Sequence, residues 1–392
     1  MKRRHVLQIA AAAGGLLTGR ELLARELGRP LGPYGERSPY EKSVRWRRES
    51  KTPEAGSSFT PLAESNGILT PSSLHYERHH AGIPNIDPEQ HRLVIAGMVD
   101  RPLQLKVDEI RRLPSLSRIL LVECGGNSGS EWAATTGASV QRSHGLASCS
   151  EWTGVSLRLL LEEVGIKPGA SWLIAEGADA GRYQRSIPLA KALDDMILAY
   201  GQNGEAIRPE QGYPLRLLVP GWEGATHVKW LQRIVIAAEP FQSRDETSKY
   251  TDLMPDGKAR QFTFPMEAKS VITSPSGGHV LPGPGLYELS GLAWSGRASV
   301  RHVEITTNGG ESWERARLQE PVLKQAFVRF RHTWRWDGRE TTIASRCTDD
   351  TGYVQQTRDS LIAIRGVNSG FHYNGIKLWK IAANGNVTNA EV

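Results

Sequence analysis

The stretch that decides the fold is Leu121-Val122-Glu123-Cys124-Gly125-Gly126-Asn127-Ser128-Gly129. Its apolar start, extended back to residue 117, predicts a strand that delivers Cys124 to its carboxyl end. The Gly pair and Asn127 permit a positive φ or a close backbone approach. A thiolate there suits a nucleophile or a soft-metal ligand. Spacing alone does not choose between these and a buried structural cysteine.

The number and surroundings of the cysteines argue against three other roles for them: a disulfide framework, a protease nucleophile and haem attachment. The chain has 392 residues and only three cysteines, an odd and sparse set that argues against a disulfide framework. A papain-like nucleophile would need a base, and His144 and His227 are available, but no protease signature surrounds Cys124. Because no Cys-x-x-Cys-His occurs, we expect no c-type haem in this chain.

Composition indicates a globular protein rather than a nucleic-acid binder. The chain is 39% apolar and 23% charged, and its 40 Gly and 22 Pro favour strands and loops. Part of the formal charge of +6 lies in the first fifty residues, and no arginine-rich helix accompanies it. We therefore expect no nucleic-acid partner.

The N-terminus predicts export. Lys2-Arg3-Arg4 precedes an apolar run over 9–17, which is typical of a twin-arginine signal peptide, here assigned to 1–28. The alternative is an ordinary basic start to a first helix. The run is too short to span a bilayer, and no later stretch reaches roughly 18 apolar residues. We expect a periplasmic protein without an integral membrane segment, and an extended arm over 29–70.

Two domains are predicted beyond the arm, giving an α+β chain. In 71–265 the pattern predicts strands over 91–97, 117–123, 172–175, 215–219 and 228–237, and helices over 155–164 and 188–200. In 266–392, period-two alternation predicts a β sandwich with strands over 287–294, 299–306, 312–318, 326–336 and 341–348. Its tryptophans are expected in the core: Trp294, Trp313, Trp334 and Trp336.

Two clusters of cationic residues flank Cys124 in the sequence. His75, Arg78, His79 and His80 lie in an irregular segment that suits zinc, an anion or a solvated loop. Farther on, a strand over 215–219 ends at Pro-Gly, and a Gly-containing loop leads to the next strand with His227 and Lys229. Such a loop can present N–H groups and cations to a phosphate.

Together these motifs resemble the molybdopterin domain of the sulfite oxidase superfamily. The order is Arg78-His79-His80, then Cys124-x-Gly-Asn127, then Ser148-Cys149-Ser150-Glu151-Trp152-Thr153-Gly154, then Pro220-Gly-x-x-Gly224 with His227-Val-Lys229-Trp230. The β region, 266–392, resembles that superfamily's immunoglobulin-like dimerisation domain. The segments 148–154, 248–257 and 269–273 are similar to one branch, the sulfane dehydrogenase subunit of the bacterial thiosulfate-oxidising Sox system.

The resemblance implies a molybdenum–molybdopterin cofactor with Cys124 as the protein ligand to the metal. Arg78 is implied to act near the metal, and Trp152 and Tyr250 to line the substrate pocket. The residues implied to hold the pterin and its phosphate are Arg78, His79, His80, Cys124, Asn127, Arg216, His227 and Lys229.

Two departures from the family pattern bear on the substrate and the cofactor. Sulfite oxidases carry a basic residue where Ser128 and Gly129 stand, which favours a sulfane sulfur on a carrier-protein cysteine over free sulfite. Gln211 replaces a histidine, which affects one pterin contact. The resemblance further implies a dihaem cytochrome c subunit and a homodimer within a heterotetramer. Sulfite dehydrogenase, a molybdenum-dependent sulfoxide reductase and a metal-free binding subunit are the alternatives.

Overall fold

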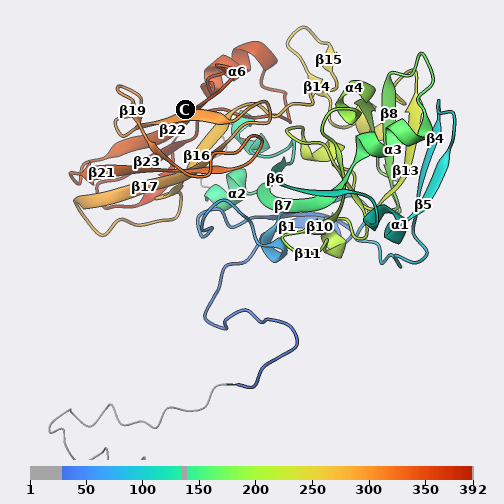
Figure 1. Ribbon diagram of the computed structural model, residues 1–392. Coiled ribbons are helices and arrows are strands. Elements are labelled where there is room, and N and C mark those ends of the chain that lie inside the picture. Colours follow the sequence, from blue (N-terminus) through green and yellow to red (C-terminus); the bar gives the residue numbers. More distant parts are fainter. Residues whose placement is uncertain (1–28, 134–138, 391–392) are drawn as a thin grey trace, which may run out of the picture. The chain divides into compact units, whose positions relative to one another are not determined.

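The computed structural model describes residues 29–133 and 139–390 (Figure 1). The chain divides into a unit of residues 1–42 and a unit of residues 43–392. The predicted signal peptide, 1–28, lies outside the described residues. The described part of the first unit, 29–42, contains no helix or strand, so all the elements below belong to the second unit.

Part of the predicted arm is folded. Strands β1 (Trp46–Thr52) and β2 (Ala55–Phe59) form an antiparallel sheet with β3 (Glu77–His79). Phe59 and Leu62 are buried, and burying such side chains favours packing this segment against the domain. The sheet matters for the site because β3 carries Arg78 and His79.

Two larger sheets build the first domain. One has the order β5 (Leu103–Lys106), β4 (Arg92–Gly97), β13 (Leu231–Ala237), β8 (Trp172–Gly177), β9 (Gln184–Pro188), with β13 and β4 parallel. The other has the order β11 (Glu205–Ala206), β10 (Ile197–Gln202), β7 (Ala147–Ser156), β6 (Ser115–Glu123), with β12 (Arg216–Leu218) also on β10. Their apolar side chains share one core with α3 (Leu157–Val164).

Of the two predicted helices, the structure contains the first, as α3, but not the second. Leu157, Leu160, Leu161 and Val164 are buried on one face of α3, as their spacing predicts, and Gly165 follows with φ 66°. The helix predicted over 188–200 is wrong: α4 (Leu189–Ala192) is short, and β10 begins at Ile197. The apolar run 197–199 pairs with β7 on one side and β12 on the other, and such a doubly paired strand has no helical period.

The second domain is a β sandwich, as predicted. One sheet runs β16 (Lys269–Ser274), β17 (Gly285–Trp294), β21 (Val328–Trp336), β20 (Arg317–Gln319). The other runs β19 (Glu314–Arg315), β18 (Val300–Thr306), β22 (Thr341–Asp349), β23 (Leu378–Ile381), β24 (Val387–Asn389). They share a core that includes three of the four named tryptophans: Trp294, Trp334 and Trp336. Trp313 is half-buried beneath the Arg346 guanidinium.

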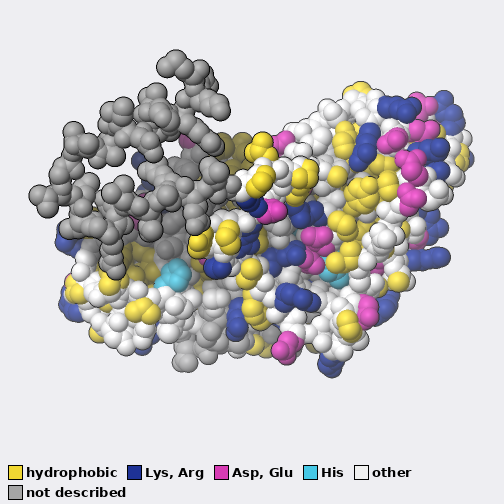
Figure 2. All heavy atoms as spheres, turned by 90° about the horizontal axis from the view of Figure 1, so that it is seen from below, with side chains coloured by type: hydrophobic (Ala, Val, Ile, Leu, Met, Phe, Trp, Pro, Cys, Tyr) yellow, Lys and Arg dark blue, Asp and Glu magenta, His cyan; other side chains and the backbone are white. Residues whose placement is uncertain are grey.

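Short elements complete the chain. They are α1 (Val107–Arg111), α2 (Val140–His144), α5 (Arg244–Thr247), the hairpin β14 (Asp252–Leu253) and β15 (Ala259–Arg260), and α6 (Arg358–Arg365). Helix α6 was not predicted. No helix among the described residues is long and apolar enough to cross a membrane. On the face in Figure 2, Lys and Arg side chains lie among acidic and apolar ones.

Candidate active site

The predicted strand and turn place Cys124 at the edge of a cavity. Strand β6 ends at Glu123, and the turn that follows closes with the Asn127 N–H donating to the Cys124 carbonyl at 2.8 Å. Gly224 faces this turn, where an added Cβ would lie 3.2 Å from the Cys124 Cα and 2.6 Å from the Tyr76 Oη. Glycine there permits the close approach. Cys124 is 8% exposed, and burial raises the pKa of its thiol.

The cavity is open to solvent, with about 650 Å³ of empty space including that solvent, and is lined by residues from both cationic clusters. Its predicted members are Arg78, His79, His80, Cys124, Arg216, His227, Lys229 and Tyr250, and the others are Tyr76, Asp179, Tyr183, Gln211, Gly224, Ala225 and Trp230. Among the described residues, Asp179 is the only carboxylate that lines the cavity. The cavity therefore favours a ligand with negative charge.

Burial weakens the charge of these cations. It lowers the pKa of His80 and His227 to about 3 and that of His79 to about 4, with neighbouring cations adding to the effect. Burial also lowers the pKa of Arg216 to about 10 and that of Lys229 well below its usual value. An anion in the cavity would act in the opposite direction and favour the charged forms.

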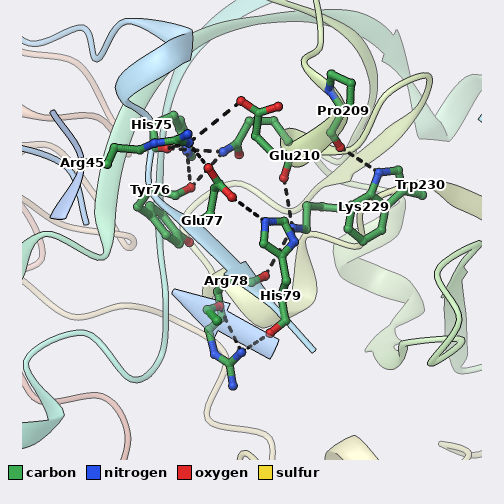
Figure 3. Close-up of polar contacts among 12 residues, drawn as sticks. Arg45, His75, Tyr76, Glu77, Arg78, His79, Pro209, Glu210, Lys229 and Trp230 are labelled. Atoms are coloured by element: carbon green, nitrogen blue, oxygen red, sulfur yellow. Dashed lines mark hydrogen bonds and ion pairs between the residues drawn. The ribbon is translucent and has the colours of Figure 1, made fainter. Parts of the chain in front are cut away.

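A hydrogen-bonded chain orients Lys229 (Figure 3). Its Nζ lies 2.9 Å from the His79 Nδ1 and also donates to the backbone carbonyls of Arg78 and Glu210. The His79 Nε2 lies 2.8 Å from the Glu77 Oε2. A carboxylate only accepts, so the His79 Nε2 donates to Glu77, and the Nδ1 of the neutral ring accepts from Lys229. The Glu77 carboxylate thereby fixes the tautomer of His79 that accepts a hydrogen bond from Lys229.

One wall of the cavity is aromatic. The His80 ring stacks on Tyr183, with centroids 5.6 Å apart, and its Nε2 is hydrogen-bonded to the Tyr250 Oη at 3.1 Å. Phe371, from the second domain, packs against Tyr250 with ring centroids 5.1 Å apart. Beneath Tyr250 the guanidinium of Arg185 lies 5.0 Å from the ring centroid. Uncharged, polarisable groups therefore line this side.

Two predicted residues do not line the cavity. Trp152 is fully buried, with the Arg216 guanidinium 5.1 Å from its ring and the His75 ring at its edge. In the structure Trp152 packs against Arg216, whereas the sequence predicted it in the substrate pocket. The Asn127 amide donates to the Glu123 Oε1 at 2.9 Å and accepts from the Leu146 N–H at 3.1 Å. Both its polar atoms thus hold the turn.

His227 and Lys229 precede the strand on which they were predicted. Strand β13 begins at Leu231, and His227 ends a short 3₁₀ turn (Gly224–Thr226). The His227 ring accepts from the Val219 N–H through Nδ1 and contacts the Trp222 carbonyl oxygen through Nε2, at 3.4 and 3.2 Å. A loop, rather than a strand, therefore presents these two side chains to the cavity.

Sequence reasoning missed three residues of the lining. Tyr76 lies within the first cationic cluster, next to His75, and Asp179 and Tyr183 lie in the connection between β8 and β9. Polar residues that follow a buried strand were an available signal for the last two. Tyr76 carried no such signal, because its neighbour across the cavity, Gly224, is distant in sequence.

The residues present fit a phosphate-bearing pterin with a metal. Arg216 is 4% exposed, and its buried Nε has no partner among the described residues. Arg216 and Lys229 are suited to a phosphate, and Cys124 supplies a soft donor at the same cavity. The site therefore fits a metal–pterin domain, and a β domain follows it in the chain.

Comparison with known protein families identifies the same two domains. Residues 80–244 match the oxidoreductase molybdopterin binding domain, and residues 260–378 match the Mo-co oxidoreductase dimerisation domain. The chain is similar to the sulfane dehydrogenase SoxCD of Paracoccus pantotrophus, at 43% identity and a TM-score of 0.91, over 94% of this chain and 97% of that one. The chain belongs to the sulfite oxidase family of molybdopterin oxidoreductases.

Other relatives differ in activity and in length. The chain is 35% identical over 320 residues to the mitochondrial sulfite oxidase of Drosophila melanogaster, covering 76% of this chain and 54% of that protein. It is 32% identical over 280 residues to the NADH nitrate reductase of Ulva prolifera, covering 63% and 32%. The chain thus spans about half or less of these two relatives, and family membership leaves the substrate open.

Proposed function

We propose that this chain is the molybdenum-dependent subunit that oxidises sulfane sulfur bound to a carrier-protein cysteine. The observation that carries the proposal is Cys124 at one cavity with Arg78, Arg216 and Lys229. Similarity to a sulfane dehydrogenase over 97% of its chain supports the substrate class. Similarity to sulfite oxidases supports sulfur oxidation more generally.

The chain's own residues divide into cofactor and substrate roles. Cys124 would ligate the metal as a thiolate, since coordination by a metal deprotonates a thiol. Lys229, oriented by Glu77 and His79, and Arg216 would hold the phosphate. When bound, the molybdenum–pterin group supplies oxygen-atom transfer to sulfur and takes up two electrons. Arg78 would stabilise negative charge that develops on the oxygen atoms.

The overall reaction sets what the site must do. Each two-electron step adds one oxygen atom from water to sulfur and releases two protons and two electrons. The aromatic wall of His80, Tyr183 and Tyr250 suits a polarisable sulfur atom, because sulfur packs favourably against ring edges. His80 would be neutral at pH 7, so it adds no charge to capture a dianion.

Free sulfite is the second candidate substrate, favoured by identity to sulfite oxidases. Against it stands the turn after Cys124. Ser128 Oγ is bonded to the buried Lys269 at 2.9 Å, and Gly129 has no side chain. With Arg216 and Lys229 assigned to the cofactor, Arg78 is the one arginine among the described lining residues that is left for a substrate anion. A dianion such as sulfite needs more compensation than that.

Turnover on two substrates tests the proposal. The purified holoenzyme is assayed with cytochrome c as acceptor, once with free sulfite and once with a persulfidated carrier protein. We expect kcat/KM for the persulfide to exceed that for sulfite by at least about tenfold, or roughly 1.4 kcal/mol of transition-state stabilisation. Faster turnover on sulfite would favour the sulfite dehydrogenase instead.

The remaining expectations belong to the same proposal. Electrons would pass singly to a dihaem cytochrome c subunit, and the second domain would form a homodimer within a heterotetramer. The protein would work in the periplasm after twin-arginine export. The match of 260–378 to a dimerisation domain supports the dimer.

A further inference from the structure

A buried ion pair joins the two domains beside Cys124. The Lys269 Nζ, at the start of β16, lies 3.1 Å from the Glu123 Oε1, at the end of β6. Both side chains are about 1% exposed. Glu123 directly precedes the cysteine in the chain, so the second domain reaches the turn on which the proposed metal ligand stands.

The Glu123–Lys269 pair is fully hydrogen-bonded. The carboxylate also accepts from the Asn127 amide at 2.9 Å and from the Trp294 indole N–H at 2.6 Å. The ammonium also donates to the Ser128 Oγ at 2.9 Å and to the Tyr373 carbonyl at 2.7 Å. All three lysine hydrogens are therefore used, which restricts the geometry of the group as a whole.

These partners bracket the cysteine on both sides. Glu123 lies before it, and Asn127 and Ser128 after it. Ser128 has φ 61°, a conformation that non-glycine residues rarely adopt, and its bond to Lys269 helps to hold it there. The second domain makes one more bond to the turn, from the His372 N–H to the Gly125 carbonyl at 2.7 Å.

A contribution to folding stability does not by itself explain the buried Glu123–Lys269 pair. A buried ion pair often contributes no more than a well-packed apolar pair of similar volume. Partners one step removed from a metal ligand, by contrast, orient the ligand and tune the metal. Neither Glu123 nor Lys269 lines the cavity, so the pair would act through the turn and not through substrate.

We infer that the Glu123–Lys269 pair is a positioning pair for Cys124, contributed jointly by the two domains. It sets the direction in which Cys124 presents its sulfur to the cofactor. The inference rests on the proposed function, because it takes Cys124 as the metal ligand. It adds a second task to the β domain besides dimerisation.

The chain offers a matched control pair. The Lys377 Nζ lies 2.9 and 2.8 Å from the two carboxylate oxygens of Glu131, and it too joins the second domain to the first. Both side chains are under a tenth exposed. Glu131 lies farther along the chain, past the turn. Among the described residues, its side chain bonds Lys377 and makes no bond to residues 123–128. Only its backbone N–H contacts the turn, by donating to the Ser128 carbonyl.

The experiment compares two neutralised pairs in the full-length holoenzyme. One variant is Glu123→Gln/Lys269→Met, and the control is Glu131→Gln/Lys377→Met. Neutralising both partners avoids leaving a lone buried charge, which would unfold the protein for a trivial reason. The readouts are molybdenum per chain, the electron paramagnetic resonance spectrum of the one-electron-reduced enzyme, kcat and KM separately, and Tm.

We expect Glu123→Gln/Lys269→Met to change the resonance spectrum, or to lose the metal, and to lower kcat about tenfold or more with KM little changed. The control should match its change in Tm but keep the wild-type spectrum and kcat. Equal spectra in all three proteins would overturn the inference, as would the same spectral change in both variants. Wild-type protein without molybdenum would instead refute the proposed function.

Discussion

The buried Arg185–Glu223 pair gives the prediction that can be worked furthest from the structure. The Arg185 Nη2 lies 2.6 Å from the Glu223 Oε1, and the two side chains are 1% and 2% exposed. The guanidinium raises the acidity of its partner: it holds the pKa of Glu223 below its usual value, against the effect of burial. The His372 Nε2 is also hydrogen-bonded to the Glu223 Oε2, at 3.1 Å.

Arg185→Met removes one charge and leaves the other buried. Breaking such a pair costs about 3–5 kcal/mol, which lowers Tm by roughly 6–20 °C for a domain of about 150–250 residues. In Arg185→Met/Glu223→Gln the Glu223 charge is removed as well, and the Gln can still bond His372. The second carboxylate beside Arg185, Glu246 at 3.8 Å, keeps its hydrogen bonds from the Ser186 N–H and Oγ. We expect the double variant to recover more than half of the lost Tm.

Thermal unfolding of the wild type and three variants, the third being Glu223→Gln, measures the coupling directly. The coupling free energy is the difference between the double variant and the sum of the singles. If Arg185→Met alone is no less stable than the double variant, the pair does not carry the stated energy. The reasoning about buried charge at this site would then be refuted.

Three other predictions concern protons, the cofactor and Trp152. Burial lowers the pKa of His75 and His227 to about 3, while the unfolded chain binds these protons near pH 6.5. Their contribution to stability is therefore present above about pH 6.5 and is lost as pH falls toward 3. The loss is about 2 kcal/mol per histidine at pH 5. In urea unfolding, the free energy of unfolding of His75→Asn should fall less steeply with falling pH than that of the wild type. Lys229→Met removes a charge-assisted bond worth about 1.5–3 kcal/mol, so pterin content after dialysis should fall while Lys191→Met, a control outside the cavity, keeps it. Trp152→Phe should cost about 1–2 kcal/mol in stability, through lost packing under Arg216, with KM unchanged; a large rise in KM would restore Trp152 to the substrate pocket.

The sequence predicted the parts of the site that depend on local pattern. Cys124 stands where an apolar strand meets a Gly-Gly-Asn turn, and both features are short-range. The cationic clusters were found because their members are close together in the chain. Helix α3 followed from apolar spacing. In each case neighbouring residues determine the structure.

What the sequence could not supply depends on long-range pairing. The run 197–199 is a strand because β7 and β12 flank it, which no local period reveals. Trp152 lies on a predicted motif, but the side chains of Arg216 and His75 pack against its ring, and it does not line the cavity. Glu123, Lys269 and Glu223 find their partners across the two domains, so their burial was invisible in the chain order.

The most direct test of the central claim is the number of sulfur atoms bound to molybdenum, measured by X-ray absorption at the metal edge. Wild-type protein and Cys124→Ser are purified from a host that makes the pterin. We predict that the variant loses one sulfur neighbour and its sulfur-oxidising activity, even where it keeps the pterin. An identical sulfur count in both proteins would contradict Cys124 as the ligand.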